Sequence, residues 1–116
     1  MIPKSVRTDT APIFGKRVVV HYLSGGRIDP IVSVWALAIA SGCDRHAAHR
    51  EMDALPAALR RRQITFDRAG AKTVGVPVGW VDELARLAEA KVPAALRPMW
   101  RLARAQVDAQ AAGGVS

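Results

Sequence analysis

The sequence predicts a small, mostly helical α+β domain. Its 116 residues are enough for one hydrophobic core, and half of them are apolar. Several segments combine an apolar helical period with residues that begin or end helices, whereas two runs in the second half alternate as strands do. We therefore expect a single domain over residues 16–112, preceded by a flexible arm at residues 1–15 and followed by a tail at residues 113–116.

The N-terminal part of the chain predicts this arm and then a strand. Residues 1–15 mix proline, glycine and polar residues without an apolar period, as mobile termini do. The run Val18–Leu23 follows, with three consecutive valines and a tyrosine, and a turn at Gly25-Gly26 comes soon after it. Its continuous apolar character indicates a strand that is buried on both faces or covered by a helix on one.

A buried helix is expected next, over Asp29–Ser41. Asp29-Pro30 is typical of a helix start, because aspartate caps free N–H groups and proline at the first helical position loses no hydrogen bond. The segment that follows is apolar almost all round, which indicates burial. Gly42 is expected to end this helix in the left-handed conformation.

A second helix is expected over Arg45–Leu55, with Asp44 as its N-cap. Its inner face would consist of Ala48, Met52 and Leu55. Pro56 then breaks the helix, and a short helical piece, Ala57–Arg62, ends in three consecutive arginines.

Residues 63–78 predict a β-hairpin with a basic tip. Gln63–Asp67 alternates with period two, residues 68–72 form a loop with a glycine and two cations, and Thr73–Val78 returns as a second extended run. Because proline cannot donate a hydrogen bond to a sheet, Pro77 predicts that the second strand lies at a sheet edge.

Two further helical segments, Val81–Lys91 and Ala94–Ala112, complete the expected domain. The last one carries an apolar stripe of Leu96, Trp100, Ala103 and Val107. Such a stripe either packs on the rest of the chain or mediates self-association, so a homodimer through the C-terminal helices is one expectation. The chain's three tryptophans, Trp35, Trp80 and Trp100, are expected in core or dimer contacts.

The charge of the chain points to polyanionic partners. Seventeen Lys and Arg residues stand against ten acids, which gives a net charge of +7. The apolar runs are too short to cross a membrane, no secretory leader pattern is present, and one cysteine excludes a disulfide within the chain. We therefore expect a cytoplasmic protein. A stripe of Arg97, Arg101 and Arg104 is either a solvated helix face or a further phosphate-binding or lipid-binding surface.

The spacing around Gly42 is typical of a helix-turn-helix. The first helix of that motif needs a small residue where the second crosses it, here Ala38, and a turn residue that tolerates positive φ four positions later. Ala48 supplies a small packing residue in the second helix. With this spacing and the hairpin, residues 29–79 resemble winged helix-turn-helix DNA-binding domains. Glu51 departs from the pattern, because such motifs usually have an aliphatic residue at this position.

The resemblance implies a sequence-specific DNA-binding protein, and we expect a small transcriptional regulator that binds double-stranded DNA. Residues on the outward face of the second helix would contact base edges in the major groove, namely Arg45, His46, His49 and Arg50. Cations of the connection and the wing would hold backbone phosphates, namely Arg60, Arg61, Arg62, Arg68 and Lys72. For the arginine triplet, the alternative is a solvated helix end that complements the helix dipole.

Other classes stay open at this point. A small phage- or plasmid-type protein could dock on a host protein or ribonucleoprotein and block its nucleic-acid contacts, and RNA is an alternative to DNA. Cys43, His46 and His49 have a spacing that metal sites use, but there is no second cysteine, so no metal or other cofactor is expected. No set of acid, base and nucleophile converges, so we do not expect an enzyme.

Overall fold

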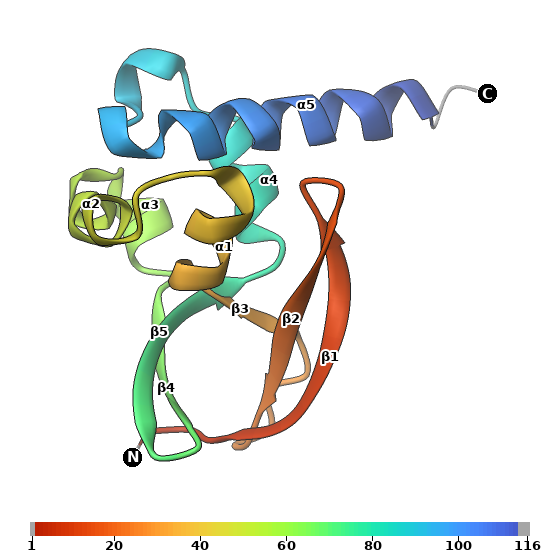
Figure 1. Cartoon of the computed structure of the whole chain (residues 1–116), viewed down its shortest axis with the longest axis vertical. Helices are drawn as coiled ribbons and strands as arrows, with labels where there is room; N and C mark the ends of the chain where they lie inside the picture. Colours follow the sequence, from red (N-terminus) through yellow and green to blue (C-terminus); the bar gives the residue numbers. More distant parts are fainter. Residues whose placement is uncertain (1, 114–116) are drawn as a thin grey trace.

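The computed structural model describes residues 2–113 and contains five β-strands and five α-helices in that part of the chain (Figure 1). In chain order these are β1 (Ser5–Ile13), β2 (Lys16–Leu23), β3 (Ile31–Ser33), α1 (Val34–Ser41), α2 (Arg45–Glu51), α3 (Ala57–Arg60), β4 (Ile64–Arg68), β5 (Ala71–Pro77), α4 (Trp80–Ala85) and α5 (Arg97–Gly113). Three single 3-10 turns are η1 (Met52–Ala54), η2 (Glu89–Lys91) and η3 (Ala94–Leu96). The α+β class is confirmed, but a mostly helical chain is not, because all five strands join one sheet.

The sheet is antiparallel, with the strand order β1-β2-β3-β5-β4. Its central strand, β3, has only three residues, and β2 pairs with it at a single position, His21 with Ile31. The two outer strands approach each other at one end, where Lys4 forms a bridge with Asp67 and the Asp67 N–H donates to the Pro3 carbonyl at 2.8 Å. The sheet is therefore strongly curved, with β1–β2 and β4–β5 as its two sides (Figure 1).

The N-terminal segment is not the flexible arm that its composition predicted. Ser5–Ile13 form strand β1, which pairs with β2 from Ser5↔Leu23 to Ile13↔Lys16. Most side chains of β1 are exposed, so the sequence carries no apolar period there, and backbone hydrogen bonds to β2 order the segment. The turn after β1 is tied to α5, because the Phe14 N–H donates to Gln106 Oε1 at 2.7 Å.

The first predicted helix begins later than expected. Asp29-Pro30 does not start it, because residues 31–33 pair with β5 and lie fully inside the sheet as β3. Ser33 is the N-cap instead, and its Oγ accepts a hydrogen bond from the Ala36 N–H at 3.0 Å. The other end of the helix is confirmed, since Gly42 has a φ of +73°.

The second helix keeps its predicted cap and inner face but is shorter. Asp44 Oδ1 accepts from the Ala47 N–H at 2.8 Å, and α2 ends at Glu51 before the η1 turn. Ala48, Met52 and Leu55 are buried, as expected. Glu51 also has a structural role, because its Oε2 accepts from the Ala95 N–H at 3.1 Å.

The predicted hairpin is present as β4 and β5, with two differences. Its tip is the two-residue turn Ala69-Gly70 rather than a five-residue loop, and both residues have positive φ, 51° and 91°. In addition, β5 lies inside the sheet and β4 is the edge strand, so the prediction from Pro77 is wrong. Pro77 is the last residue of β5, where a missing N–H interrupts no further pairing.

The C-terminal helices pack on the rest of the chain. The predicted helix Val81–Lys91 is only α4 followed by η2, whereas α5 lies across α1 and α4 (Figure 1). Leu96 and Ala103 are fully buried, Trp100 and Val107 pack on the core, and Trp100 Nε1 donates to the Leu87 carbonyl at 3.0 Å. The apolar stripe thus packs on the rest of the chain, which is one of its two expected uses, and Trp100 and Val107 are only partly buried there. The homodimer stays a prediction. Of the predicted tail, residues 114–116 lie outside the described residues.

The arginines of α5 also have partners inside the chain. Arg97 Nε donates to the Val92 carbonyl at 3.2 Å, and Arg104 donates to the Ala85 carbonyl at 3.2 Å. Arg101 lies 4.0 Å from a carboxylate oxygen of Glu89. This stripe therefore attaches α5 to the segment before it. Within residues 2–113, no helix has both the length and the apolar character that crossing a membrane requires.

Candidate functional site

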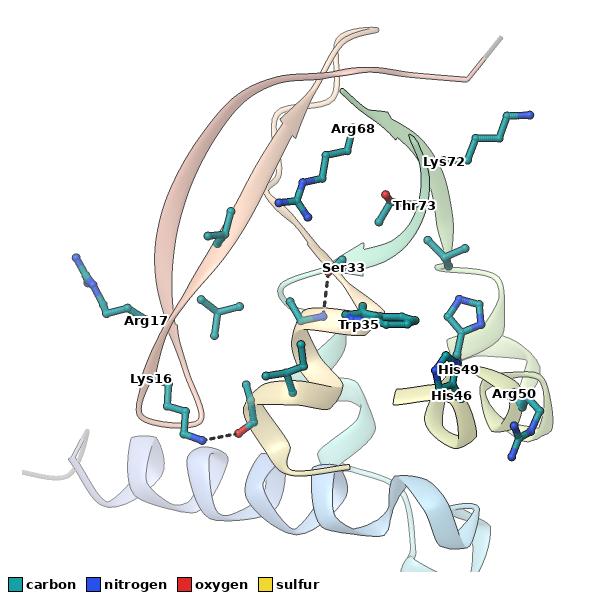
Figure 2. A pocket seen from close by; sticks show the side chains of 16 residues that line it. Lys16, Arg17, Ser33, Trp35, His46, His49, Arg50, Arg68, Lys72 and Thr73 are labelled. Carbon is teal, nitrogen blue, oxygen red and sulfur yellow. Dashed lines mark hydrogen bonds between the residues drawn. The ribbon is translucent and has the colours of Figure 1, made fainter. Parts of the chain in front are cut away.

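A groove of about 940 Å³ lies between the two sides of the curved sheet, next to α1 and α2 (Figure 2). It is open because β3 is so short. β5 pairs with β3 only at residues 75–77, so residues 16–19 of β2 and 72–74 of β5 extend beyond β3 and line the groove from opposite sides. The exposed sides of α1 and α2 supply the rest of its lining.

The lining of this groove is strongly basic. Among the described residues that form it there is no aspartate or glutamate. Five Lys and Arg residues and two histidines contribute, namely Lys16, Arg17, Arg50, Arg68, Lys72, His46 and His49. Positive charge collected in a concave surface attracts polyanions and raises their local concentration.

The structure places α2 with its four predicted contact residues exposed, and three of them line the groove: His46, His49 and Arg50. The opposite face of α2 packs inward through Ala48, which is fully buried, as is Ala38 on α1. The Asp44 cap fixes the start of the helix. Its carboxylate accepts the Ala47 N–H, and this hydrogen bond holds the pKa of Asp44 below its usual value.

Arg45, the fourth predicted contact residue, lies against Trp35 at the start of α1. The Arg45 guanidinium carbon is 4.6 Å from the centre of the Trp35 ring, a cation–π distance. The His46 ring meets the same indole nearly at right angles, with the ring centres 5.2 Å apart. Of the expected core or dimer contacts of the tryptophans, Trp80 is fully buried in the core. Trp35 is 39% exposed and is therefore not a core residue, and the expectation of a dimer contact stays a prediction for it.

The hairpin contributes Arg68 and Lys72 to the groove, as predicted cations of the wing. Arg68 acts on the buried His21 of β2, whose Nδ1 lies 2.8 Å from the Ser5 hydroxyl oxygen. Burial, and secondly the positive charge of Arg68, lower the pKa of His21 below its ordinary value. His21 is therefore neutral near pH 7, and it adds no charge to the groove.

The arginine triplet does not join this surface. Arg60 Nε donates to the Leu55 carbonyl at 2.9 Å, and Arg62 forms an ion pair with Glu83. Arg61 is exposed and lies beside Arg60 near Asp53, in a separate shallow depression. None of the three arginines is among the residues that line the groove.

Sequence reasoning missed the wall that β2 provides and the apolar part of the lining. Lys16 and Arg17 come from the first hairpin, and Lys16 Nζ donates to the Ala40 carbonyl at 3.1 Å. Trp35 and Ile39 are four residues apart, which places them on one face of a helix, and that spacing was the available signal. Val19 is exposed, but it stands in the sequence between the buried residues Val18 and Val20, so the run of valines gave no sign of its exposure.

Cys43, His46 and His49, which have the spacing of metal ligands in the sequence, do not come together around one site in the structure. Cys43 is buried and accepts a hydrogen bond from the Ser41 hydroxyl at 3.3 Å, whereas His46 and His49 are exposed. Among residues 2–113, no three histidine, cysteine, aspartate or glutamate side chains are arranged to hold a metal ion.

Comparison of the chain with protein-family models, with curated proteins and with solved structures gives no match. The geometry and the charge of the groove and of α2 are therefore the observations that indicate a function.

Proposed function

We propose that this protein is a sequence-specific DNA-binding protein, a small transcriptional regulator that contacts duplex DNA with α2 and the β4–β5 hairpin. The observation that carries the proposal is that Arg50 of α2 and Arg68 and Lys72 of the hairpin line one surface, and that this lining contains no carboxylate among the described residues. Such a surface favours the phosphate backbone of a nucleic acid.

The connection between the helix pair and the hairpin supports this assignment. Gly42 makes the turn between α1 and α2, and the two small residues Ala38 and Ala48 allow close packing of the helices. β3 leads directly into α1 and pairs with β5. The hairpin is therefore joined through the sheet to the helices that it flanks. A wing needs such a connection if it is to contact DNA beside a recognition helix.

Each side chain then has a distinct role. Arg45 and Arg50 project from α2 and are suited to a bidentate contact with guanine, and His49 lies between them on the exposed face. Trp35 holds Arg45 in place, which lowers the entropy that a contact to a base would cost. Arg68 and Lys72 are assigned to phosphates.

The phosphate contacts are not assigned to the arginine triplet. Arg60 and Arg62 are already bound to Leu55 and Glu83, and a contact to DNA would have to replace those interactions. Arg61, which is exposed, lies away from the groove.

The experiment is a mobility-shift measurement of the full chain on random duplex DNA, at low salt and at rising salt. The double variant Arg50→Ala/Lys72→Ala is compared with Arg86→Ala/Lys91→Ala, which removes the same charge from two exposed positions outside the groove. We expect a large loss of affinity and a shallower salt dependence only for the first variant. If the folded protein does not bind duplex DNA at low salt, or if both variants lose affinity equally, the proposal is wrong and docking on a protein becomes the better hypothesis.

A further inference from the structure

The groove offers apolar surface as well as charge. Trp35, Ile39 and Val19 line it, and they are 39%, 57% and 43% exposed. Large apolar side chains exposed together in a concave site are typical of ligand binding. The direct contacts proposed for duplex DNA are made by polar groups of α2 and the hairpin. None of these three apolar side chains is assigned a direct contact with the duplex.

The size of the groove and the chemistry of Trp35 restrict its ligand. About 940 Å³ is within the range of sites that enclose small molecules, about 300–1,000 Å³. In a duplex the faces of the bases are covered by their neighbours, so an indole ring has no base face to stack on. An unpaired nucleotide presents a free base face and a phosphate within a few ångströms of it.

We propose that the groove binds a short single-stranded segment of nucleic acid, with one base stacked on Trp35 and the adjoining phosphates held by the cations of the two walls. Figure 2 shows Arg68 pointing into the groove above Trp35, whereas Arg17 and Lys72 extend outward from the β2 and β5 walls. Lys16 lies at the foot of the β2 wall, where its Nζ donates to the Ala40 carbonyl at 3.1 Å. A strand that crosses the groove over Trp35 therefore meets Arg68 beside the stacked base and further positive charge at both rims.

Trp35 is held ready for stacking by its neighbours on α2. The guanidinium of Arg45 lies over one face of the ring, 4.6 Å from its centre, and the His46 ring meets the indole edge-on, so both restrict it. The base is assigned to the face opposite Arg45. A side chain that is already ordered loses little conformational freedom when it binds. An acidic peptide would also satisfy the cations, but its carboxylates offer no planar ring to the indole, so the exposed Trp35 favours a base.

This inference shares Arg68 and Lys72 with the duplex proposal. It differs in requiring the β2 wall and a direct contact of Trp35 with a base, neither of which the proposed duplex complex uses. Duplex binding and single-strand binding can therefore fail separately.

The test uses the full chain and a short fluorescent oligothymidylate, with a duplex of equal length and polyglutamate as the other two probes. Trp35→Ala is expected to weaken oligothymidylate binding by about 5- to 150-fold, because base–aromatic stacking contributes that much in single-strand sites. Trp35→Phe should keep most of the affinity, since it keeps a stacking ring. Lys91→Ala, an exposed lysine outside the groove, should leave it unchanged.

A second readout locates the base. Trp80 is fully buried and Trp100 is partly buried, so Trp35 is the most exposed of the three indoles. Oligothymidylate should quench the intrinsic fluorescence of the unmodified protein, and Trp35→Phe should abolish most of that change. Circular dichroism checks that both variants are folded, and Trp35→Phe serves as the test if Trp35→Ala does not fold.

The outcomes separate the proposals. Equal binding of oligothymidylate by the unmodified protein and by folded Trp35→Ala would overturn the single-strand assignment. It would also be overturned if the protein bound polyglutamate but not oligothymidylate and that binding required Trp35. Duplex binding without oligothymidylate binding would overturn it too and leave the duplex proposal standing. Oligothymidylate binding without duplex binding would support it and overturn the duplex proposal.

Discussion

Two arginine-rich regions of this protein differ in what surrounds their charges. In the groove, Arg17, Arg50 and Arg68 face a lining without carboxylates among the described residues. On α5, Arg97, Arg101 and Arg104 each contact a carbonyl or a carboxylate of the same chain. The number and spacing of arginines do not distinguish a ligand surface from a structural contact. The hydrogen bonds and ion pairs that the arginines already make within the chain distinguish the two.

The largest expected effect concerns the apolar stripe of Leu96, Trp100, Ala103 and Val107, most of which lies on the same helix, α5, as these structural arginines. Trp100→Ala should lower the free energy of unfolding by about 2–4 kcal/mol, because the side chain packs on the core and its Nε1 donates to the Leu87 carbonyl. Urea unfolding measures this loss, and sedimentation velocity measures the oligomeric state. A folded variant of unchanged stability whose oligomeric state has changed would show that the stripe is an interface after all.

A smaller effect is expected from one of the arginines on that helix. Arg104→Ala should destabilise the fold by about 0.5–1 kcal/mol, because a charged donor to the Ala85 carbonyl is lost from a half-exposed position. Arg101→Ala is the matched control, since its side chain is more exposed and its distance to Glu89 is 4.0 Å. Neither variant should alter the affinity for DNA. A clear loss of DNA affinity in Arg104→Ala would remove the distinction between the two regions.

The smallest expected effect is on the pH dependence of the free energy of unfolding, and it involves Arg68 of the groove. The fold holds the pKa of His21 below 6.5. Below about pH 6.5 the unfolded chain therefore binds more protons than the folded chain, and the free energy of unfolding falls as the pH decreases through that range. At higher pH this contribution is fully present. Arg68→Ala should raise the pKa of His21 toward its ordinary value and weaken this pH dependence, because one positive charge near the ring is removed.

Nuclear magnetic resonance titration of the His21 ring measures this shift. Arg104→Ala is the control, since Arg104 lies on α5 and the charge that lowers the pKa of His21 comes from Arg68. An unchanged His21 titration in Arg68→Ala would mean that burial alone sets this pKa.

Local signals in the sequence predicted the parts of the fold that depend on them. Gly42 ends α1, Asp44 caps α2, and Ala38 and Ala48 are the small buried residues of the helix pair. The hairpin was also predicted, because its strands alternate and its tip contains Gly70. Each of these features is determined by a few neighbouring residues.

Features that depend on distant pairing could not be predicted. β1 has mostly exposed side chains, and only its hydrogen bonds to β2 make it a strand. β3 looked like the start of a helix because its apolar residues Ile31 and Val32 suit either structure, and pairing with β5 decides between them. The β2 wall of the groove and the exposure of Trp35 both follow from these pairings.

The most direct test of the central claim compares Arg50→Ala with Arg68→Ala on a selected DNA site and on a scrambled duplex, across a range of salt concentrations. Arg50 projects from α2 and is assigned to a base, whereas Arg68 lies on the hairpin and is assigned to a phosphate. We predict that Arg50→Ala costs about 1–3 kcal/mol on the selected site and little on the scrambled one. Arg68→Ala should weaken both complexes alike and reduce the salt slope by about one. If Arg50→Ala lowers both affinities equally, α2 does not read the DNA sequence, and the account is contradicted.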